Sequence, residues 1–203
     1  MYVVLLTGGL ASGKDTVSAI LAKLGATILD LDVIAKEEQV KEPTLTRLTQ
    51  EFGDDIVDSS GLLNRSLLAK RAFSDEESTN KLNEICWPPV MRRVDGLISD
   101  SISQPLDKGG LFVIQIPLLA EAPDLLDKKN EVISVVADEE LRFRRAVNRG
   151  MTEVDALNRI ARQACDDDRI AISDTVFTNN GSLEELRAQV ISWYTQGTES
   201  GLF

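Results

Sequence analysis

Short apolar runs alternate with longer amphipathic stretches along most of the chain. The runs are rich in β-branched residues and cover Val3–Thr7, Ala26–Leu29, Leu111–Gln115, Val132–Ala137 and, more weakly, Thr175–Thr178. Runs of this kind are typical of parallel strands buried on both faces. Between them, apolar residues recur at helical spacing over Thr16–Leu24, Thr44–Phe52, Arg65–Phe73, Pro88–Ser103, Glu139–Asn148, Thr152–Gln163 and Ser182–Trp193. The alternation predicts an α/β fold, a doubly wound parallel sheet of about five strands flanked by helices.

One gap between the predicted strands is much longer than the others. Roughly 80 residues separate the second run from the third, far more than one crossover helix needs. We therefore expect an inserted helical subdomain over residues 38–104, punctuated by Gly53, Gly61 and Pro88–Pro89. The chain as a whole, residues 1–203, is expected to be a single domain that ends in a loose tail, Thr195–Phe203.

Composition restricts the partners and the compartment. The 203 residues include 43% hydrophobic and 27% charged positions, as in an ordinary soluble globular protein. The net charge of −11 argues against nucleic acid or an anionic membrane as a partner. No apolar run could span a bilayer and no export signal is evident, so we expect a cytoplasmic protein. With no histidine, and with Cys86 and Cys165 far apart, a zinc site is not expected.

The most specific motif directly follows the first predicted strand. Residues 8–14 read GGLASGK and match the phosphate loop G-x-x-x-x-G-K between a strand and a helix, as that motif requires. Gly8 and Gly13 would allow backbone angles that turn N–H groups toward a phosphate. Lys14 would then reach the β- and γ-phosphates. The expected ATP contacts in this loop are Gly9, Leu10, Ala11, Ser12, Gly13, Lys14, Asp15 and Thr16.

Position 15 departs from the phosphate-loop pattern. Serine or threonine normally follows the lysine and binds Mg²⁺, whereas this chain has Asp15 followed by Thr16. A carboxylate is a good hard ligand for Mg²⁺, but it also adds negative charge beside the phosphates. Either Asp15 contacts the ion, directly or through water, or it faces away and Thr16 supplies the hydroxyl.

A candidate general base lies at the end of the second predicted strand, which reads Asp30-Leu31-Asp32. Reactive residues collect at the carboxyl ends of strands in open parallel sheets. We assign Asp32 as the base that accepts the proton of an attacking hydroxyl, and Asp30 as a helix cap or a supporting partner of Mg²⁺. N-capping of the next helix is the alternative role for Asp32.

Arginines concentrate in one stretch of this acidic chain. Seven arginines and no lysine occur from Arg142 to Arg169. Arg145 and Arg149 are four residues apart and hence on one helix face, and guanidinium groups suit the charge that develops in phosphoryl transfer. We expect a helical lid over residues 138–170, with Gly150 as a helix stop and hinge. Alternatively, single arginines of the stretch pair with nearby surface carboxylates.

Weaker motifs, taken together in their order and spacing, are similar to those of the dephospho-CoA kinases. The resemblance covers nearly the whole chain: TGGLASGK at 7–14, Asp30-Leu31-Asp32 with Ile34-Ala35, Phe52-Gly53, Gly61-Leu62-Leu63-Asn64-Arg65, Phe73-Ser74-Asp75, Ile116-Pro117-Leu118-Leu119 with Glu121, Arg145 with Arg149, Gln163, Ser173-Asp174 and Asn179-Asn180-Gly181.

The resemblance implies ATP-dependent phosphorylation of the ribose 3′-hydroxyl of dephospho-CoA. It implies that Asp32 is the catalytic aspartate, that Arg65 holds the acceptor, and that Arg145 and Arg149 face the ATP phosphates. Lys14, Asp32 and Arg145 are thus the expected catalytic residues. Pro117 and Leu118 are included among the substrate contacts, although their pattern by itself indicates mainly packing. The inserted helical region would receive the acceptor.

Some positions depart from the family and leave other functions open. Trp87 stands before Pro88 where the family usually has histidine, and could stack on the acceptor or anchor the subdomain. The segment after Gln163 reads Cys165-Asp166-Asp167-Asp168, with three acidic residues where the family is commonly basic. The alternatives are another small-molecule kinase, such as a nucleoside monophosphate kinase, or an inactive nucleotide-binding module. A compact kinase with a moving lid is expected to be a monomer.

Overall fold

The computed structural model describes residues 1–102, 110–116, 125, 127 and 129–203. Within these residues five strands form one parallel sheet in the order β2-β3-β1-β4-β5. The strands are β1 (Tyr2–Gly8), β2 (Thr27–Asp30), β3 (Leu111–Gln115), β4 (Glu131–Val136) and β5 (Thr175–Thr178). The doubly wound parallel sheet predicted from the apolar runs is confirmed, with each strand within two residues of its predicted bounds.

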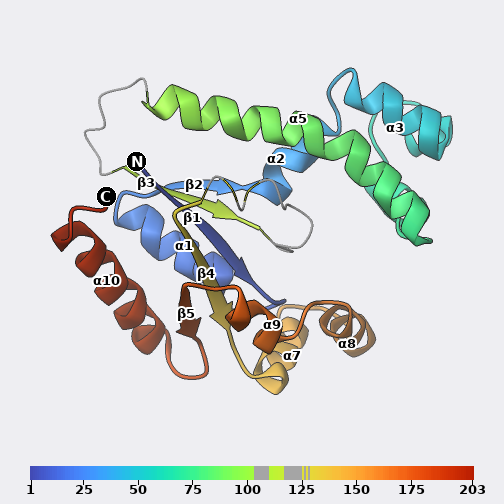
Figure 1. Cartoon of the computed structure of the whole chain (residues 1–203). Coiled ribbons are helices and arrows are strands. Elements are labelled where there is room, and N and C mark those ends of the chain that lie inside the picture. The colour runs from blue at the N-terminus through green and yellow to red at the C-terminus, as the bar shows by residue number, and fades with distance from the viewer. Residues whose placement is uncertain (103–109, 117–124, 126, 128) are drawn as a thin grey trace. The chain divides into compact units, whose positions relative to one another are not determined.

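Strand β1 lies at the centre of the sheet, where its apolar run is buried on both faces. Leu5 pairs with Ile114 of β3 on one side and with Val132 of β4 on the other. Two helices, α1 (Lys14–Lys23) and α10 (Leu183–Glu199), pack on one face and share a core with the strands. This arrangement can be followed in Figure 1. The carboxyl end of β1, from which the phosphate loop departs, is therefore held on a rigid base.

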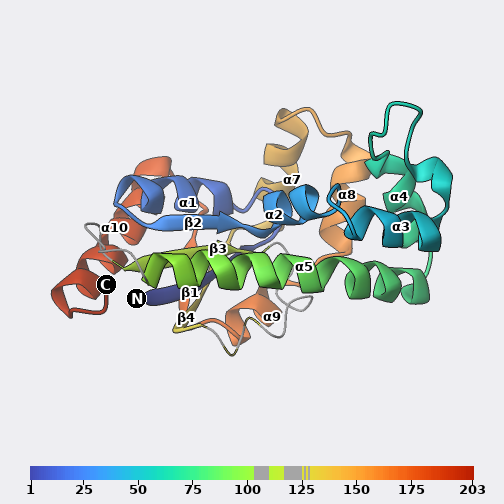
Figure 2. The ribbon, with the colours of Figure 1, turned by 90° about the horizontal axis from the view of Figure 1, so that it is seen from above.

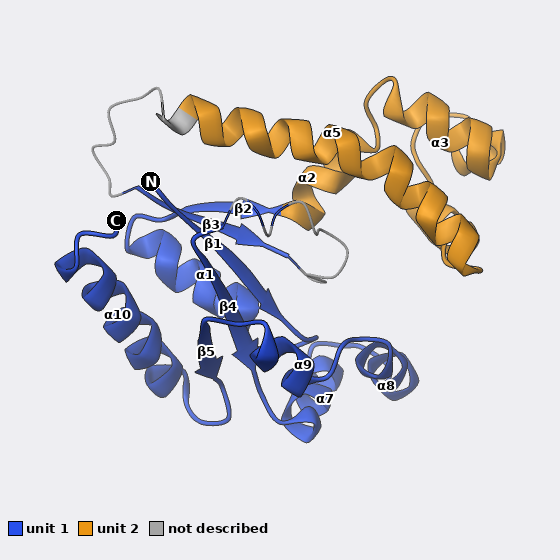
Figure 3. Ribbon diagram, in the orientation of Figure 1, with its two compact units in different colours: residues 1–30, 105–203 blue, residues 31–104 orange. Residues whose placement is uncertain are grey.

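The chain divides into two compact units, coloured in Figure 3. The first contains residues 1–30 and 105–203, with the whole sheet; the second contains residues 31–104 and is helical. The predicted insertion over residues 38–104 falls inside this second unit. Its elements are α2 (Leu31–Glu38), α3 (Thr44–Phe52), the short 3₁₀ turn Asp54–Ile56, α4 (Arg65–Ala72) and α5 (Glu76–Ile102). Their core is built from Leu48, Phe52, Ile56 and neighbouring apolar residues.

Helix α5 is longer than its sequence pattern predicts. Pro88 and Pro89 lie inside it, although each proline removes a backbone donor. Buried Leu82 and Ile85 precede the prolines, and buried Val90 and Val94 follow them at helical spacing. Packing on both sides of the prolines outweighs the lost hydrogen bonds, so the predicted break at Pro88–Pro89 is wrong. Viewed from above, α5 is the long green helix of Figure 2.

The stretch rich in arginine forms three helices of the first unit: α7 (Glu139–Asn148), α8 (Glu153–Ala161) and α9 (Asp166–Ala171). Gly150, at φ 93°, ends α7 in the left-handed conformation that glycine adopts without strain. Helix α9 packs on β1 and β4. Helix α9 was not predicted, because it is short and its first turn consists of three aspartates that mask the apolar periodicity. Helix α2 begins at Leu31, and the sequence indicated only that some helix follows Asp30-Leu31-Asp32, without giving its bounds.

The carboxyl terminus is not a loose tail. Helix α10 continues to Glu199, and the ring of Phe203 lies 5.3–5.4 Å from the ring centroids of Tyr2, Trp193 and Tyr194. The prediction was wrong because the partners of Phe203 are distant in sequence or spaced around a helix. In the described part of the chain, no helix is both long enough and apolar enough to span a membrane.

Candidate active site

The phosphate loop connects the buried end of β1 to α1. Gly13 is the residue before α1 and has φ 108°, so a side chain would be strained there. Ala11 also adopts a left-handed conformation, with φ 57°. Gly8 does not: it ends β1, and a Cβ built on it would stand 2.5 Å from Ser12 Oγ and 2.8 Å from the Val135 carbonyl oxygen. Gly8 is thus required for space, and the expectation that it supplies the unusual backbone angle is corrected to Ala11.

Two side chains from distant parts of the chain hold this loop. The Asn179 side-chain amide donates to the Ser12 carbonyl oxygen over 2.7 Å, and the Leu10 N–H donates to Gln163 Oε1, also over 2.7 Å. Asn179 follows β5, and Gln163 lies between α8 and α9. The loop is thereby tied to the edge of the sheet and to the predicted lid.

The two predicted lid arginines have different surroundings. Arg145 is partly buried and donates from Nη2 to the Asn179 carbonyl oxygen over 2.9 Å. Its Nη1 is buried and has no hydrogen-bond partner among the described residues. Arg149, which caps the end of α7, is exposed. Arg145 is therefore fixed beside the residue that holds the loop, with one donor still available.

A second pair of arginines is almost completely buried. Arg142 of α7 and Arg169 of α9 are 4% and 3% exposed. Asp166 Oδ1 lies 3.9 Å from Arg142 Nη2 and 4.0 Å from Arg169 Nε, while Arg169 Nη1 donates to Thr7 Oγ1 over 3.3 Å. Burial lowers the pKa of the Arg169 guanidinium, and Asp166 acts in the opposite direction. Sequence reasoning marked the arginine-rich stretch but did not single out this pair, because burial is not visible in composition.

Asp15 lies in the first turn of α1 and is exposed. Its Oδ1 accepts a long hydrogen bond, 3.4 Å, from Nε2 of Gln115. Gln115 is buried at the carboxyl end of β3, the strand next to β1. The Asp15 carboxylate and the side-chain amide of Gln115 thus lie side by side at the loop. Gln115 was not among the site residues predicted from the sequence, although a polar residue that ends an otherwise apolar strand was an available signal.

The predicted acceptor residues Asp32 and Arg65 both belong to the second unit. Asp30 ends β2, and Asp32 is exposed in the first turn of α2. Arg65, the first residue of α4, donates from Nη2 to the carbonyl oxygen of Lys36 over 3.0 Å. Lys36 is four residues beyond Asp32, about 6 Å along α2. The helix start that carries Arg65 is fixed by Asn64, whose side chain accepts from the N–H of Leu67. The structure therefore brings Arg65 to the same helix as Asp32.

The comparisons with known proteins bear on this geometry. The model of the dephospho-CoA kinase family matches residues 2–185 of the chain, which include the loop, all five strands, the whole second unit and the arginine-bearing helices. The chain belongs to the dephospho-CoA kinase family. A dephospho-CoA kinase of Corynebacterium jeikeium is 41% identical over 94% of this chain and 96% of its own length. One of Corynebacterium glutamicum is 40% identical over 91% of both chains.

A solved structure from Thermus thermophilus covers 96% of this chain and 97% of its own, with 29% identity and a TM-score of 0.79. Its likeness extends over the sheet and the helices together. The P-loop kinase fold and the family predicted from the motifs are thus both confirmed.

Not every residue selected from the sequence can be placed in this family's site. Pro117 and Leu118 lie outside the described residues, as does Glu121. Trp87 is partly buried within α5. The stacking and anchoring roles considered for it both stay predictions.

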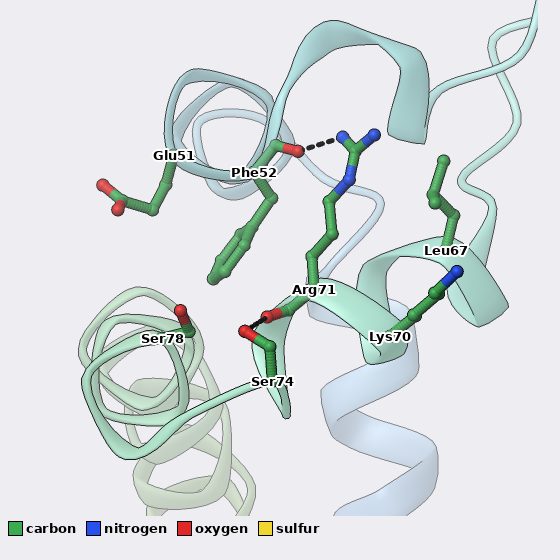
Figure 4. Close-up of a pocket in the computed structure, with 7 residues that line it drawn as sticks. All are labelled: Glu51, Phe52, Leu67, Lys70, Arg71, Ser74 and Ser78. Carbon is green, nitrogen blue, oxygen red and sulfur yellow. Dashed lines mark hydrogen bonds between the residues drawn. The ribbon is translucent and has the colours of Figure 1, made fainter.

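A pocket of about 450 Å³ lies within the second unit, between α3, α4 and the start of α5 (Figure 4). Phe52, Lys70, Arg71 and Ser74 are among its lining residues, whereas Asp32 and Arg65 are not. Arg71 is engaged already, because it forms two 2.6 Å hydrogen bonds to Asp55 and keeps the pKa of that carboxyl below its usual value. We therefore do not include this pocket in the candidate active site.

Proposed function

We propose that this chain transfers the γ-phosphate of ATP to the ribose 3′-hydroxyl of dephospho-CoA, the last step of coenzyme A biosynthesis. The observation that carries the proposal is an intact phosphate loop in a chain that belongs to the dephospho-CoA kinase family over nearly its whole length. The proposal includes cytoplasmic location and a monomeric enzyme that binds neither nucleic acid nor membrane.

On the ATP side, the loop backbone and three cations would hold the phosphates. Ala11 and Gly13 are left-handed, a conformation that would turn loop N–H groups inward and suit an anion at the start of α1. Lys14 would bridge the β- and γ-phosphates. Arg145, held by Asn179, would direct its unpartnered Nη1 to the phosphates, and the exposed Arg149 at the end of α7 would be the second arginine.

The residues near the loop fit Mg²⁺ as the partner of ATP. Mg²⁺ prefers oxygen ligands and keeps several waters, so that a protein usually supplies one or two of its ligands. Among the described residues no three acidic or sulfur ligands gather as a complete cage. The bond from Gln115 directs the Asp15 carboxylate toward the carboxyl end of β3, which favours Asp15 over Thr16 as the ligand. When bound, the ion would neutralise charge on the β- and γ-phosphates.

On the acceptor side, Asp32 would accept the proton of the 3′-hydroxyl as that oxygen attacks the γ-phosphorus. Arg65 would hold an anionic group of the acceptor, since its guanidinium is fixed at one end of the helix that begins beside Asp32. Both assignments rest on the placement of these residues on one helical unit and on the family's D-x-D and G-x-L-x-R segments.

The test is a coupled assay of ATP consumption with dephospho-CoA, dCMP, dTMP, AMP and adenosine as separate acceptors. We expect turnover with dephospho-CoA, with coenzyme A identified as the product by mass. Turnover only with a nucleoside monophosphate would refute the acceptor, and binding of ATP without turnover on any acceptor would indicate a nucleotide-binding module. The Lys14→Met variant controls for contaminating kinases.

A further inference from the structure

The buried arginine pair carries more positive charge than the described protein neutralises. Arg142 and Arg169 contribute two guanidinium groups, and within the described residues Asp166 is the only carboxylate within 4.0 Å of either. Four nitrogens of the pair, Nε and Nη1 of Arg142 and Nε and Nη2 of Arg169, are buried without a hydrogen-bond partner in the same part of the chain. Buried charges are ordinarily paired and hydrogen-bonded. One positive charge and several donors are therefore left for a ligand.

The guanidinium of Arg142 lies directly beside the phosphate loop. A Cβ built on Gly9 would stand only 2.1 Å from Arg142 Nη1. The same Cβ would be 3.4 Å from Gln163 Oε1. Because Gly9 has no side chain, the guanidinium lies against the loop backbone. Thr7, at the end of β1, accepts from Arg169 and fixes the second guanidinium behind the first.

We propose that Arg142 is a further residue for the terminal phosphate of ATP: its Nη1 donates to the γ-phosphate, and Arg169 with Asp166 holds it in place. This inference rests on the proposed function only as far as ATP is the phosphoryl donor. The guanidinium lies against Gly9 of the loop, whereas the loop N–H groups at the start of α1 and Lys14 would hold the β-phosphate. A fixed planar cation there stabilises the charge that accumulates on the γ-phosphate oxygens during transfer.

The competing explanation is that Arg142 is only the structural partner of Asp166. The two explanations differ in the effect of removing its charge. In Arg142→Gln, the negative charge of Asp166 is still balanced by the positive charge of Arg169, so the net charge of the buried cluster falls from +1 to zero. The proposal expects the variant to keep its melting temperature without nucleotide, whereas a structural ion pair would be broken and the melting temperature would fall.

The deciding experiment measures the affinities of the purified full chain for Mg-ATP and Mg-ADP by calorimetry, without acceptor. We expect Arg142→Gln to weaken ATP binding by roughly 10- to 100-fold, the effect of a lost charged hydrogen bond, and to leave ADP binding nearly unchanged. The matched control is Arg144→Gln on the same helix, because Arg144 is exposed and paired with Glu140. Equal losses for ATP and ADP, or no loss for either, would overturn the assignment.

A second variant keeps the inference testable if Arg142→Gln does not fold. Asp166→Asn leaves both guanidiniums without a counter-charge, so we expect a lower melting temperature without ligand and a larger increase on adding Mg-ATP than in the wild type. A lower melting temperature with an unchanged increase on adding ATP would refute the proposal. Since no acceptor is present, these results are independent of dephospho-CoA. A wrong acceptor is detected separately, as a wild type that binds ATP but does not turn over dephospho-CoA.

Discussion

The Asn179 side-chain amide donates to the main-chain oxygen of Ser12 over 2.7 Å and joins the end of β5 to the middle of the phosphate loop. The carbonyl oxygen of Asn179 in turn accepts from Arg145. One residue therefore connects the sheet, the loop and a predicted lid arginine. A Cβ on Gly13 would stand 2.3 Å from Asn179 Nδ2, so the contact also depends on a glycine at that position.

Asn179→Ala should impair ATP binding beyond its effect on stability. Loss of the hydrogen bond to Ser12 should lower the free energy of unfolding by about 1 kcal/mol and raise KM for ATP, because the loop loses its tie to β5. Asn180→Ala is the matched control: Asn180 forms two side-chain hydrogen bonds with Asp138 and none with the loop. Urea denaturation and steady-state kinetics measure the two effects. Equal values of KM in the two variants would contradict the role of Asn179.

Gly9→Ala should destabilise the loop through Arg142. The added Cβ cannot share space with Nη1, which would be only 2.1 Å away, so we expect a loss of about 1–3 kcal/mol in the free energy of unfolding. In an Arg142→Gln background the loss should be smaller, which a double-mutant cycle measures. Gly96→Ala, where the new Cβ would meet nothing within 4 Å beyond the neighbouring backbone of its own helix, should be neutral or stabilising. Additive losses in the cycle would show that the two residues do not interact.

Asp15→Ser should change the dependence of ATP binding on Mg²⁺. If Asp15 supplies a ligand, removing its carboxylate should reduce the gain in ATP affinity that Mg²⁺ provides and shift the Mg²⁺ titration of ATP binding to higher concentrations. Thr16→Val is the counterpart that tests the hydroxyl. An unchanged Mg²⁺ dependence in Asp15→Ser, with a shift in Thr16→Val, would assign the ligand to Thr16.

Asp32→Asn should lose catalytic turnover while its affinity for ATP stays unchanged. Removal of a general base typically lowers kcat by roughly 100- to 10,000-fold, whereas ATP binding by the loop should be unaffected. Asp30→Asn, two residues earlier, provides the control and should retain most of its activity. Calorimetry with ATP and the coupled assay measure both properties. Near wild-type kcat in Asp32→Asn would remove it as the base.

Tyr2 should make folding stability depend on pH in the alkaline range. Burial, with the nearby Glu131 carboxylate as the next cause, raises the pKa of Tyr2 from 10.0 to about 12. Between these values the unfolded chain loses the phenolic proton and the folded chain keeps it, so the free energy of unfolding should decrease as pH rises from 10 to 12. Tyr2→Phe should reduce this slope in urea denaturation series. The same slope in both proteins would contradict the prediction.

The strands, the phosphate loop and the family were accessible from the sequence because their signals are local. An apolar run such as Val3–Thr7 reports its own burial, and a glycine-rich turn that ends in Lys14 has few other uses between a strand and a helix. Asn179 and Gln163 were noted only as parts of the family pattern. Their role in holding the loop depends on contacts that cross more than 150 residues of sequence.

Other features could not be predicted from local sequence patterns, because they depend on packing between residues that are distant in the sequence. Pro88 and Pro89 predict a helix break, because proline has no backbone N–H to donate. Helix α5 nevertheless continues through them, since buried residues pack on both sides. Phe203 follows a polar segment and looked like a tail, yet its ring completes an aromatic cluster with Tyr2.

By itself, the sequence determined that this chain is an α/β phosphate-loop kinase of the dephospho-CoA kinase family. Strand burial and loop chemistry depend on neighbouring residues, and the order of the motifs is read directly along the chain. Only the tertiary structure decided which of its seven arginines from Arg142 to Arg169 are buried against the loop. An arginine's charge is the same at every position, and its use depends on how much solvent and how many counter-charges the fold leaves around it. Arg142 and Arg169 are distinguished from exposed Arg144 by that surrounding alone.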